Sequence, residues 1–276
     1  MSTWRAAPMR PKASRSFARG LAVLEALNRL GSATALMLAN ESKVPRATVY
    51  RLLQTLLDLG YVRRSPGDDR YQLRLKVRGL SEGFEDEHWI SAVAAPVLLD
   101  VTKSISWPCD VSTLEGVRMI IRDTTHRVAP LSIDRNMVGR EMPLLGSSAG
   151  LAYIAFTSAA ERATLLGLLA RSDDPADAPA RDTAYAERVI AATQRLGYGL
   201  RQGGPIWPHS GAVALPITDG DRVLGCISAI WMARVIGHDE GVERCLTPLR
   251  AAKATIEARL AGGADQDVAL STSRAN

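Results

Sequence analysis

The hydrophobic pattern of residues 42–64 predicts a helix that buries one face and leaves the other free. Apolar side chains recur there at helical spacing, at Val49, Leu52, Leu53 and Leu56. Pro45 has a fixed φ and no N-H, so we expect the helix to begin just after it. The free face carries donors suited to base edges and phosphates, at Arg46, Thr48, Tyr50, Arg51 and Gln54. Taken alone, this pattern is also typical of an amphipathic helix with a solvated basic face.

The neighbouring segments favour a DNA-reading role for this helix. The pattern predicts a helix over 17–30, capped by Ser16 and ended by Gly31, and a short helix from Thr34 to about Glu41. After Gly60, residues 61–63 and 71–73 alternate as two strands around a turn at 65–70. Three helices followed by a hairpin predict a winged helix-turn-helix, in which Arg63 and Arg64 are placed to meet phosphates.

The remaining sequence predicts an α+β fold with an antiparallel sheet backed by helices. Expected helices cover 75–86, 89–105, 151–156, 159–169, 185–196 and 239–260. Expected strands cover 109–114, 117–122, 129–133, 211–217 and 223–232. Gly116 and the pair Asp219-Gly220 mark the turns of two hairpins.

Length and composition favour two domains with flexible ends. The chain has 276 residues, of which 46% are hydrophobic, enough for two buried cores. We expect a disordered arm over 1–14, a DNA-binding domain over 15–74 and a linker helix over 75–88. An effector-binding domain over 89–261 and a disordered tail over 262–276 complete the predicted organisation.

The charge is uneven along the chain. The formal net charge is +5, but residues 1–80 carry +10 and the rest carries −5. A basic region confined to one part of the chain is typical of a nucleic-acid-binding surface. Three widely spaced cysteines fit reduced thiols better than a disulfide framework. With no apolar run of membrane-spanning length, a cytoplasmic protein is expected.

Four segments of the chain form a recognisable set, PRATVYRLLQTLLDLGYV, GREMPLLGSSAGLAYIAF, LGYGLRQGG and GAVALPITDGDRVLGCISAIW. Together they resemble the isocitrate lyase regulator (IclR) family of bacterial transcription factors. The segments WISAVAAPVL, WPCDVST, IWP and ISAIW resemble the MhpR-like subgroup, which controls hydroxyphenylpropionate and related aromatic-acid catabolism.

The resemblance implies an N-terminal winged helix joined to a GAF/PAS-like effector-binding domain. It also implies a homodimer or homotetramer on a palindromic operator in double-stranded DNA, a small-molecule effector, and RNA polymerase as a further partner. DNA contacts map onto Arg46, Thr48, Tyr50 and Arg51. Lys43 stands where many relatives have glycine, so it is mildly strained if that position needs a positive φ.

The resemblance further implies an effector pocket. Its candidate residues are Cys109, Met142, Leu144, Ser148, Ala149, Gly150, Ser228, Ile230 and Trp231. Independently of the resemblance, the N-H groups that begin a helix near Ser147 suit a carboxylate, and Arg201 can supply a countercharge. Trp207 and Trp231 can supply an aromatic wall, which favours an aromatic acid, although plain core packing explains Trp231 equally well.

Two other classes of protein stay open from the sequence. Gly146 to Gly150 reads G-x-S-x-G, which in a serine hydrolase would need His209 or His238 as base and Asp219 or Asp239 to orient it. A hydrolase core needs a parallel sheet, whereas the pattern predicts hairpins, so we expect no enzyme. The scattered histidines and cysteines show no metal-ligand spacing, and no cofactor is expected. The other alternative is a sensor or interaction protein that does not bind DNA.

Overall fold

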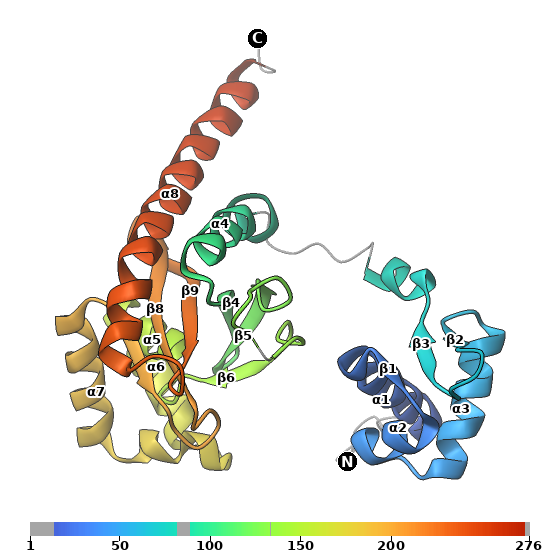
Figure 1. Ribbon diagram of the computed structural model, residues 1–276. Coiled ribbons are helices and arrows are strands. Elements are labelled where there is room, and N and C mark those ends of the chain that lie inside the picture. The colour runs from blue at the N-terminus through green and yellow to red at the C-terminus, as the bar shows by residue number, and fades with distance from the viewer. Residues whose placement is uncertain (1–13, 82–88, 133, 274–276) are drawn as a thin grey trace, which may run out of the picture. The chain divides into compact units, whose positions relative to one another are not determined.

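The computed structural model describes residues 14–81, 89–132 and 134–273 (Figure 1). The chain divides into two compact units, Met1–Glu85 and Asp86–Asn276. The predicted arm lies outside the described residues apart from Ser14, and so do residues 82–88 of the predicted linker.

The N-terminal unit is a winged helix. Its helices are α1 (Arg15–Leu30), α2 (Ala35–Ser42) and α3 (Arg46–Asp58). Its strands are β1 (Ser32–Ala33), β2 (Val62–Arg64) and β3 (Tyr71–Leu73), paired antiparallel in the order β1-β3-β2. The three helices and the wing were predicted. Strand β1 was missed because two residues show no period, and Ser14, rather than Ser16, caps α1 by accepting from the Phe17 N-H.

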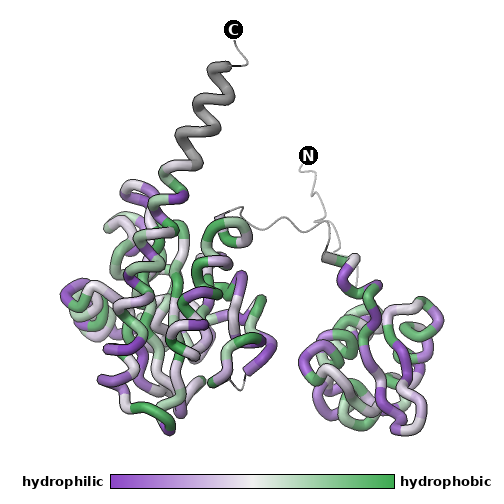
Figure 2. The backbone as a smooth tube through the Cα atoms, turned by 45° about the horizontal axis from the view of Figure 1, so that its top comes forward, coloured by the Kyte–Doolittle hydropathy of each residue, from purple (hydrophilic) through white to green (hydrophobic). Residues whose placement is uncertain are grey.

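Helix α3 is held by its apolar stripe. Val49, Leu53 and Leu56 are buried among residues of α1 and α2, while the free face stays exposed. Along the helices of this unit, hydrophobic and hydrophilic positions alternate as amphipathic packing requires (Figure 2). In the turn before α3, Lys43 has φ 57° and ψ 24°, so the lysine does occupy the left-handed region that favours glycine.

The segment after the wing differs from the predicted helices. Leu75–Ser81 forms a 3-10 helix, not an α-helix, because Leu75 and Leu80 are exposed and no apolar stripe is buried. Residues Trp89–Ala94 form a π-helical turn that leads into α4 (Ala95–Ile105). Pro96 has no N-H for the usual helical bond, and the wider turn accommodates this gap.

The second unit is built on one antiparallel sheet of six strands, in the order β6-β5-β4-β9-β8-β7. The strands are β4 (Cys109–Glu115), β5 (Arg118–Thr124), β6 (Glu141–Pro143), β7 (Gly199–Gln202), β8 (Ser210–Asp219) and β9 (Arg222–Met232). Its helices, besides α4, are α5 (Ser148–Phe156), α6 (Ala159–Ala170), α7 (Thr183–Leu196) and α8 (His238–Ser273). A 3-10 helix, Pro175–Arg181, precedes α7.

Helices cover both faces of this sheet (Figure 1). Helices α4 and α8 pack on one face, over Val111, Val213 and Ile227. Helix α5 packs on the other face, with α6 and α7 outside it, over Met119, Ile121 and further apolar residues. The α+β fold with an antiparallel sheet was therefore predicted correctly.

One predicted strand of this unit is wrong. Residues 129–132 form turns and not a strand, because Pro130 interrupts the segment and the amides of Val128 and Ala129 both bond the Thr125 carbonyl. Helix α8 continues to Ser273, within the segment 262–276 for which a disordered tail is expected.

Candidate functional site

The free face of α3 presents the predicted DNA-contacting side chains. Arg46, Tyr50, Arg51 and Gln54 are exposed and Thr48 is half-buried. Arg46 Nη2 donates to Tyr50 Oη at 3.2 Å, and its Cζ lies 5.6 Å from the centre of the Tyr50 ring. Gln54 donates to Asp58 at 2.8 Å. Within the described residues, the Arg51 side chain makes no hydrogen bond or ion pair, so it is the most available of these groups.

The wing arginines are exposed but engaged. Arg63 donates to Gln72 on the facing strand at 2.8 Å, and Arg64 forms an ion pair with Asp69 at the tip of the wing. A phosphate contact by Arg64 would have to compete with that carboxylate. Of these α3 and wing arginines, only Arg51 has a guanidinium without a side-chain partner among the described residues.

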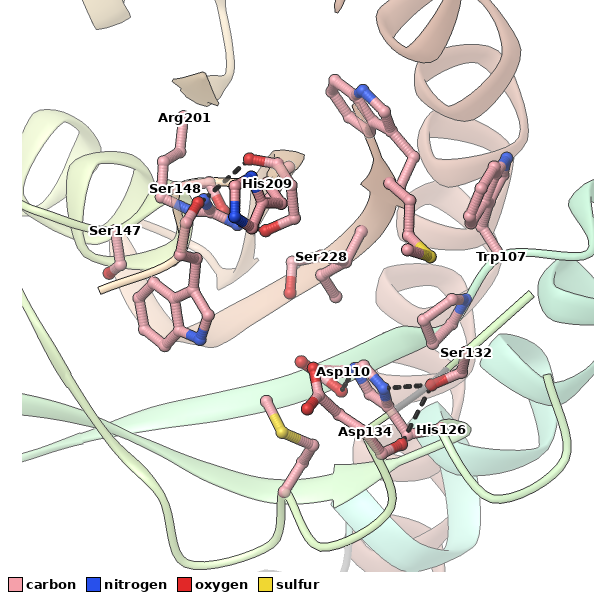
Figure 3. Close-up of a pocket in the computed structure, with 18 of the residues that line it drawn as sticks. Trp107, Asp110, His126, Ser132, Asp134, Ser147, Ser148, Arg201, His209 and Ser228 are labelled. Carbon is pink, nitrogen blue, oxygen red and sulfur yellow. Dashed lines mark hydrogen bonds and ion pairs between the residues drawn. The ribbon is translucent and has the colours of Figure 1, made fainter. Parts of the chain in front are cut away.

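A cavity of about 210 Å³ lies in the second unit, beside the N-terminus of α5 (Figure 3). Its floor is one face of the sheet. Asp110 on β4 and Ser228 on β9 are directly paired there, and Ile230 pairs with Ala212 on β8 one step further along. The walls are mostly apolar. They are formed by aromatic, methionine and aliphatic side chains, at Trp107, Leu131, Met137, Met142, Ile206, Trp207, Trp231 and Met232.

One end of the cavity is cationic. Arg201 on β7 donates through Nη1 to the carbonyls of Gly203, Trp207 and Ser210 and through Nη2 to Ser210 Oγ, at 2.9 to 3.2 Å. All these partners are neutral, and burial lowers the pKa of the guanidinium to about 10. This half-buried charge therefore lacks a carboxylate partner among the described residues.

The N-terminus of α5 lies near this end (Figure 3). Ser147 caps the helix: its Oγ accepts from the Gly150 N-H at 3.0 Å and donates to the Pro143 carbonyl at 2.8 Å. The Gly150 N-H, one of the backbone amides expected to bind a carboxylate, therefore already donates to Ser147. The hydroxyls of Ser148 and Ser228 make no hydrogen bond within the described chain and line the cavity.

The structure brings together six of the ten residues predicted for the pocket. Those that line the cavity are Met142, Ser148, Arg201, Ser228, Ile230 and Trp231. Trp231 is also a core residue, fully buried and packed against Gly211 and Gly241, so it contributes both to the core and to the cavity wall.

Four predicted pocket residues do not line the cavity. Cys109 points to the opposite face of the sheet, toward α4 and α8, because neighbouring strand residues alternate in direction. Burial raises the pKa of its thiol to about 12. Leu144, Ala149 and Gly150 pack beneath the cavity. Gly150 approaches the Leu144 backbone so closely that a Cβ would lie 2.4 Å from its oxygen.

The second polar end of the cavity, which was not predicted from the sequence, is formed by Asp110 and His126 together with Ser132 and Asp134 (Figure 3). Strand alternation in WPCDVST would have found Asp110, since Cys109 and Val111 share the other face. His126 follows β5 in an irregular loop, where no periodic pattern marks it.

The cavity does not contain a hydrolase constellation. Ser148, the serine of the G-x-S-x-G motif, follows the three-residue antiparallel strand β6. Among the described residues, no histidine hydrogen-bonds to Ser148 and no carboxylate orients His209, which also lines the cavity. Likewise, no three acidic, histidine or cysteine side chains in the described chain are grouped to hold a metal ion.

Comparison with known proteins identifies the family. Residues 16–66 match the IclR helix-turn-helix domain. The chain is 32% identical over 211 residues to the Pca regulon regulatory protein of Pseudomonas putida, covering 72% of this chain and 71% of that protein. The chain belongs to the IclR family. It is thus a DNA-binding transcription regulator, and its regulatory relatives point against enzymatic activity.

Solved IclR structures share its fold. An IclR homologue from Microbacterium hydrocarbonoxydans, complexed with 4-hydroxybenzoate, is 22% identical with a TM-score of 0.59, covering 90% of this chain and 99% of its own. Thermotoga maritima IclR is 16% identical with a TM-score of 0.60, covering 89% and 98%. The narrower resemblance to the MhpR-like subgroup stays a prediction. In the described part of this IclR chain, no helix has the length and apolar character needed to span a bilayer.

Proposed function

We propose that this IclR-family regulator responds to an aromatic carboxylic acid bound in the cavity of its second unit, and that two or four copies read a palindromic operator. The observation that carries the proposal is the half-buried Arg201 guanidinium, surrounded by neutral acceptors at one end of an aromatic-lined cavity.

The charge of Arg201 favours an anionic ligand. Burial of a cation without a countercharge costs free energy, and desolvation is the cause of its lowered pKa. A carboxylate at this end would offset that cost and accept hydrogen bonds from Arg201 and from the Ser148 and Ser228 hydroxyls.

The shape of the cavity favours an aromatic ring. Three tryptophans line it, and its volume is about 210 Å³. A dry apolar cavity of about 150 Å³ holds one benzene molecule, so a ring with small substituents fits here. The Microbacterium homologue that binds 4-hydroxybenzoate has the same fold, which supports an aromatic ligand without identifying it.

On the DNA side, we assign the base and phosphate contacts to α3, with Arg51 as the most available guanidinium, and additional phosphate contacts to Arg63 and Arg64. The acid regulates DNA binding only if its affinity differs between two arrangements of the assembled protein. In that case the ligand changes the affinity of the protein for the operator, and the operator changes the affinity of the protein for the ligand by the same factor.

Fluorescence anisotropy with the DNA upstream of the protein's own gene tests this function. We expect binding that weakens in Arg51→Ala, and an operator affinity that changes when benzoate or 4-hydroxybenzoate is added. If short oxoacids change the affinity and aromatic acids do not, the aromatic assignment is wrong. Loss of binding in Arg51→Ala with unchanged thermal unfolding separates DNA contact from misfolding.

A further inference from the structure

The end of the cavity away from Arg201 is an incomplete hydrogen-bonding site. Asp110 and His126 are 2% and 4% exposed, and Figure 3 shows them across the cavity from Arg201, with Ser228 between. Asp110 Oδ1 accepts from the Thr124 hydroxyl at 2.6 Å. The His126 Nε2 is buried and has no hydrogen-bond partner within the described chain.

Neighbouring hydrogen bonds fix the tautomer of His126. The Ser132 hydroxyl donates to the Asp134 carbonyl at 2.9 Å, so its single proton is used. Ser132 Oγ therefore accepts from His126 Nδ1, which lies 2.7 Å away. In the neutral ring Nδ1 carries the proton, and Nε2 presents its lone pair to the cavity.

The two groups are close enough for one ligand atom on the cavity side to reach either of them. His126 Nε2 lies 3.7 Å from Asp110 Oδ1, too far for a direct hydrogen bond. A carboxylate oxygen and an imidazole lone pair are both acceptors, so the group that satisfies them must donate a proton. A hydroxyl does so without the large desolvation cost of an ammonium group, whereas a second carboxylate would be repelled by Asp110.

We infer that the effector is a hydroxylated aromatic monocarboxylate, with its carboxylate at Arg201 and its hydroxyl within reach of the Asp110 and His126 pair, donating its one proton to one of these two acceptors. The inference rests on the proposed aromatic-acid function and adds the chemistry of the far end of the ligand. Asp110 and His126 thereby determine specificity, since an analogue without the hydroxyl offers no donor to either of them and leaves the buried His126 Nε2 unsatisfied.

Isothermal titration of the full chain with matched ligands tests this. The pairs are benzoate with 3- and 4-hydroxybenzoate, and phenylpropionate with 3-(4-hydroxyphenyl)propionate. In at least one pair we expect the hydroxylated acid to bind about tenfold more tightly or better. The methyl ether of that acid, which cannot donate, should lose the gain. Equal affinity within every pair, or tighter binding of terephthalate or 4-(aminomethyl)benzoate, would overturn the inference.

Variants locate the effect. His126→Gln and Asp110→Asn should each remove the preference for the hydroxylated acid while the parent acid keeps its affinity within about twofold. Asp221→Asn, which makes the same change in the exposed β8–β9 turn, should keep the preference. Thermal unfolding shows whether each variant is folded. If one pocket variant does not fold, the other still tests the assignment. A preference retained in both folded pocket variants contradicts the assignment.

The two proposals fail differently. If no aromatic acid binds the wild-type chain, the proposal of an aromatic effector is wrong, and so is the proposed hydroxyl site. If aromatic acids bind and alter operator affinity but the hydroxyl adds nothing, the proposed function stands and only the role of Asp110 and His126 is wrong.

Discussion

The guanidinium carbon of Arg201 lies 5.0 Å from the centre of the Trp207 ring, and Arg201 Nη1 also donates to the Trp207 carbonyl at 3.2 Å. The Arg201 side chain therefore supplies the positive charge at one end of the cavity. It also stabilises the loop between β7 and β8, which forms part of the cavity wall. Replacing this residue would therefore change both the charge of the cavity and the support of the loop.

Replacing Arg201 should abolish the preference for an anion. We expect the wild-type protein to bind benzoate about 10- to 100-fold more tightly than benzamide, as a charged hydrogen bond would provide. Arg201→Met should bring the ratio near one, and Arg201→Lys should keep part of it. The ratio, measured by titration calorimetry, corrects for damage to the loop, which affects both ligands. An unchanged ratio in Arg201→Met would mean that another group binds the carboxylate.

Asp110 should make stability depend on pH. Burial raises the pKa of its carboxyl, an effect that Asp123 and Asp134 add to and that His126 and the Thr124 hydroxyl oppose. The folded state thus holds this proton to higher pH than the unfolded state, so its contribution is most favourable in acid and is lost as pH rises through the raised pKa. Asp110→Asn, which does not titrate, should gain stability relative to wild type between acid and neutral pH.

Urea unfolding at several pH values measures that difference. Asp221→Asn, at an exposed turn, serves as the control and should show a smaller trend. If the stability of Asp110→Asn instead falls relative to wild type as pH rises, the carboxylate form is stabilised, and attraction to His126 outweighs burial.

Local signals explain which parts of the structure could be predicted. Helix α3 begins as expected because Pro45 and the apolar stripe act within a few residues, and the β8–β9 hairpin follows from Asp219-Gly220. The cavity depends on strand pairing over long sequence distances, such as Asp110 opposite Ser228. A choice one residue off, Cys109 for Asp110, reverses the face of the sheet.

Arg46 and Arg188 form a matched pair for testing DNA contact. Each is an exposed arginine near a tyrosine of its own helix, with Cζ 5.6 Å from the Tyr50 ring and 5.9 Å from the Tyr185 ring, respectively. Arg46→Ala should weaken operator binding by about tenfold and reduce its salt dependence, since one phosphate or base contact is lost. Arg188→Ala, on α7, should change neither. Equal effects of both in anisotropy would indicate a general charge effect.

Lys43 should tolerate glycine better than valine. Its left-handed conformation costs an L-residue about 1–2 kcal/mol, while glycine loses about 0.4–1 kcal/mol through the entropy of the unfolded chain. Lys43→Gly should therefore leave the N-terminal unit equally or slightly more stable, and Lys43→Val should destabilise it. Because Lys43 is exposed, side-chain packing contributes little. Urea unfolding followed by circular dichroism gives the order, and a more stable valine variant would contradict it.

Gly241 on α8 should resist alanine because of Trp231. A Cβ at Gly241 would lie 2.2 Å from Trp231 Cε2, and the fully buried ring is confined on its other side by Gly211. Gly241→Ala should lower the free energy of unfolding by about 1–3 kcal/mol through overpacking, despite the better helix propensity of alanine. Gly167→Ala, in α6 with no atom within 4 Å of its Cβ, should raise it by up to about 1 kcal/mol. Changes of opposite sign in the free energy of unfolding, measured with urea, would show that Trp231 is held by close packing. Because Trp231 lines the cavity, only Gly241→Ala should also weaken benzoate binding.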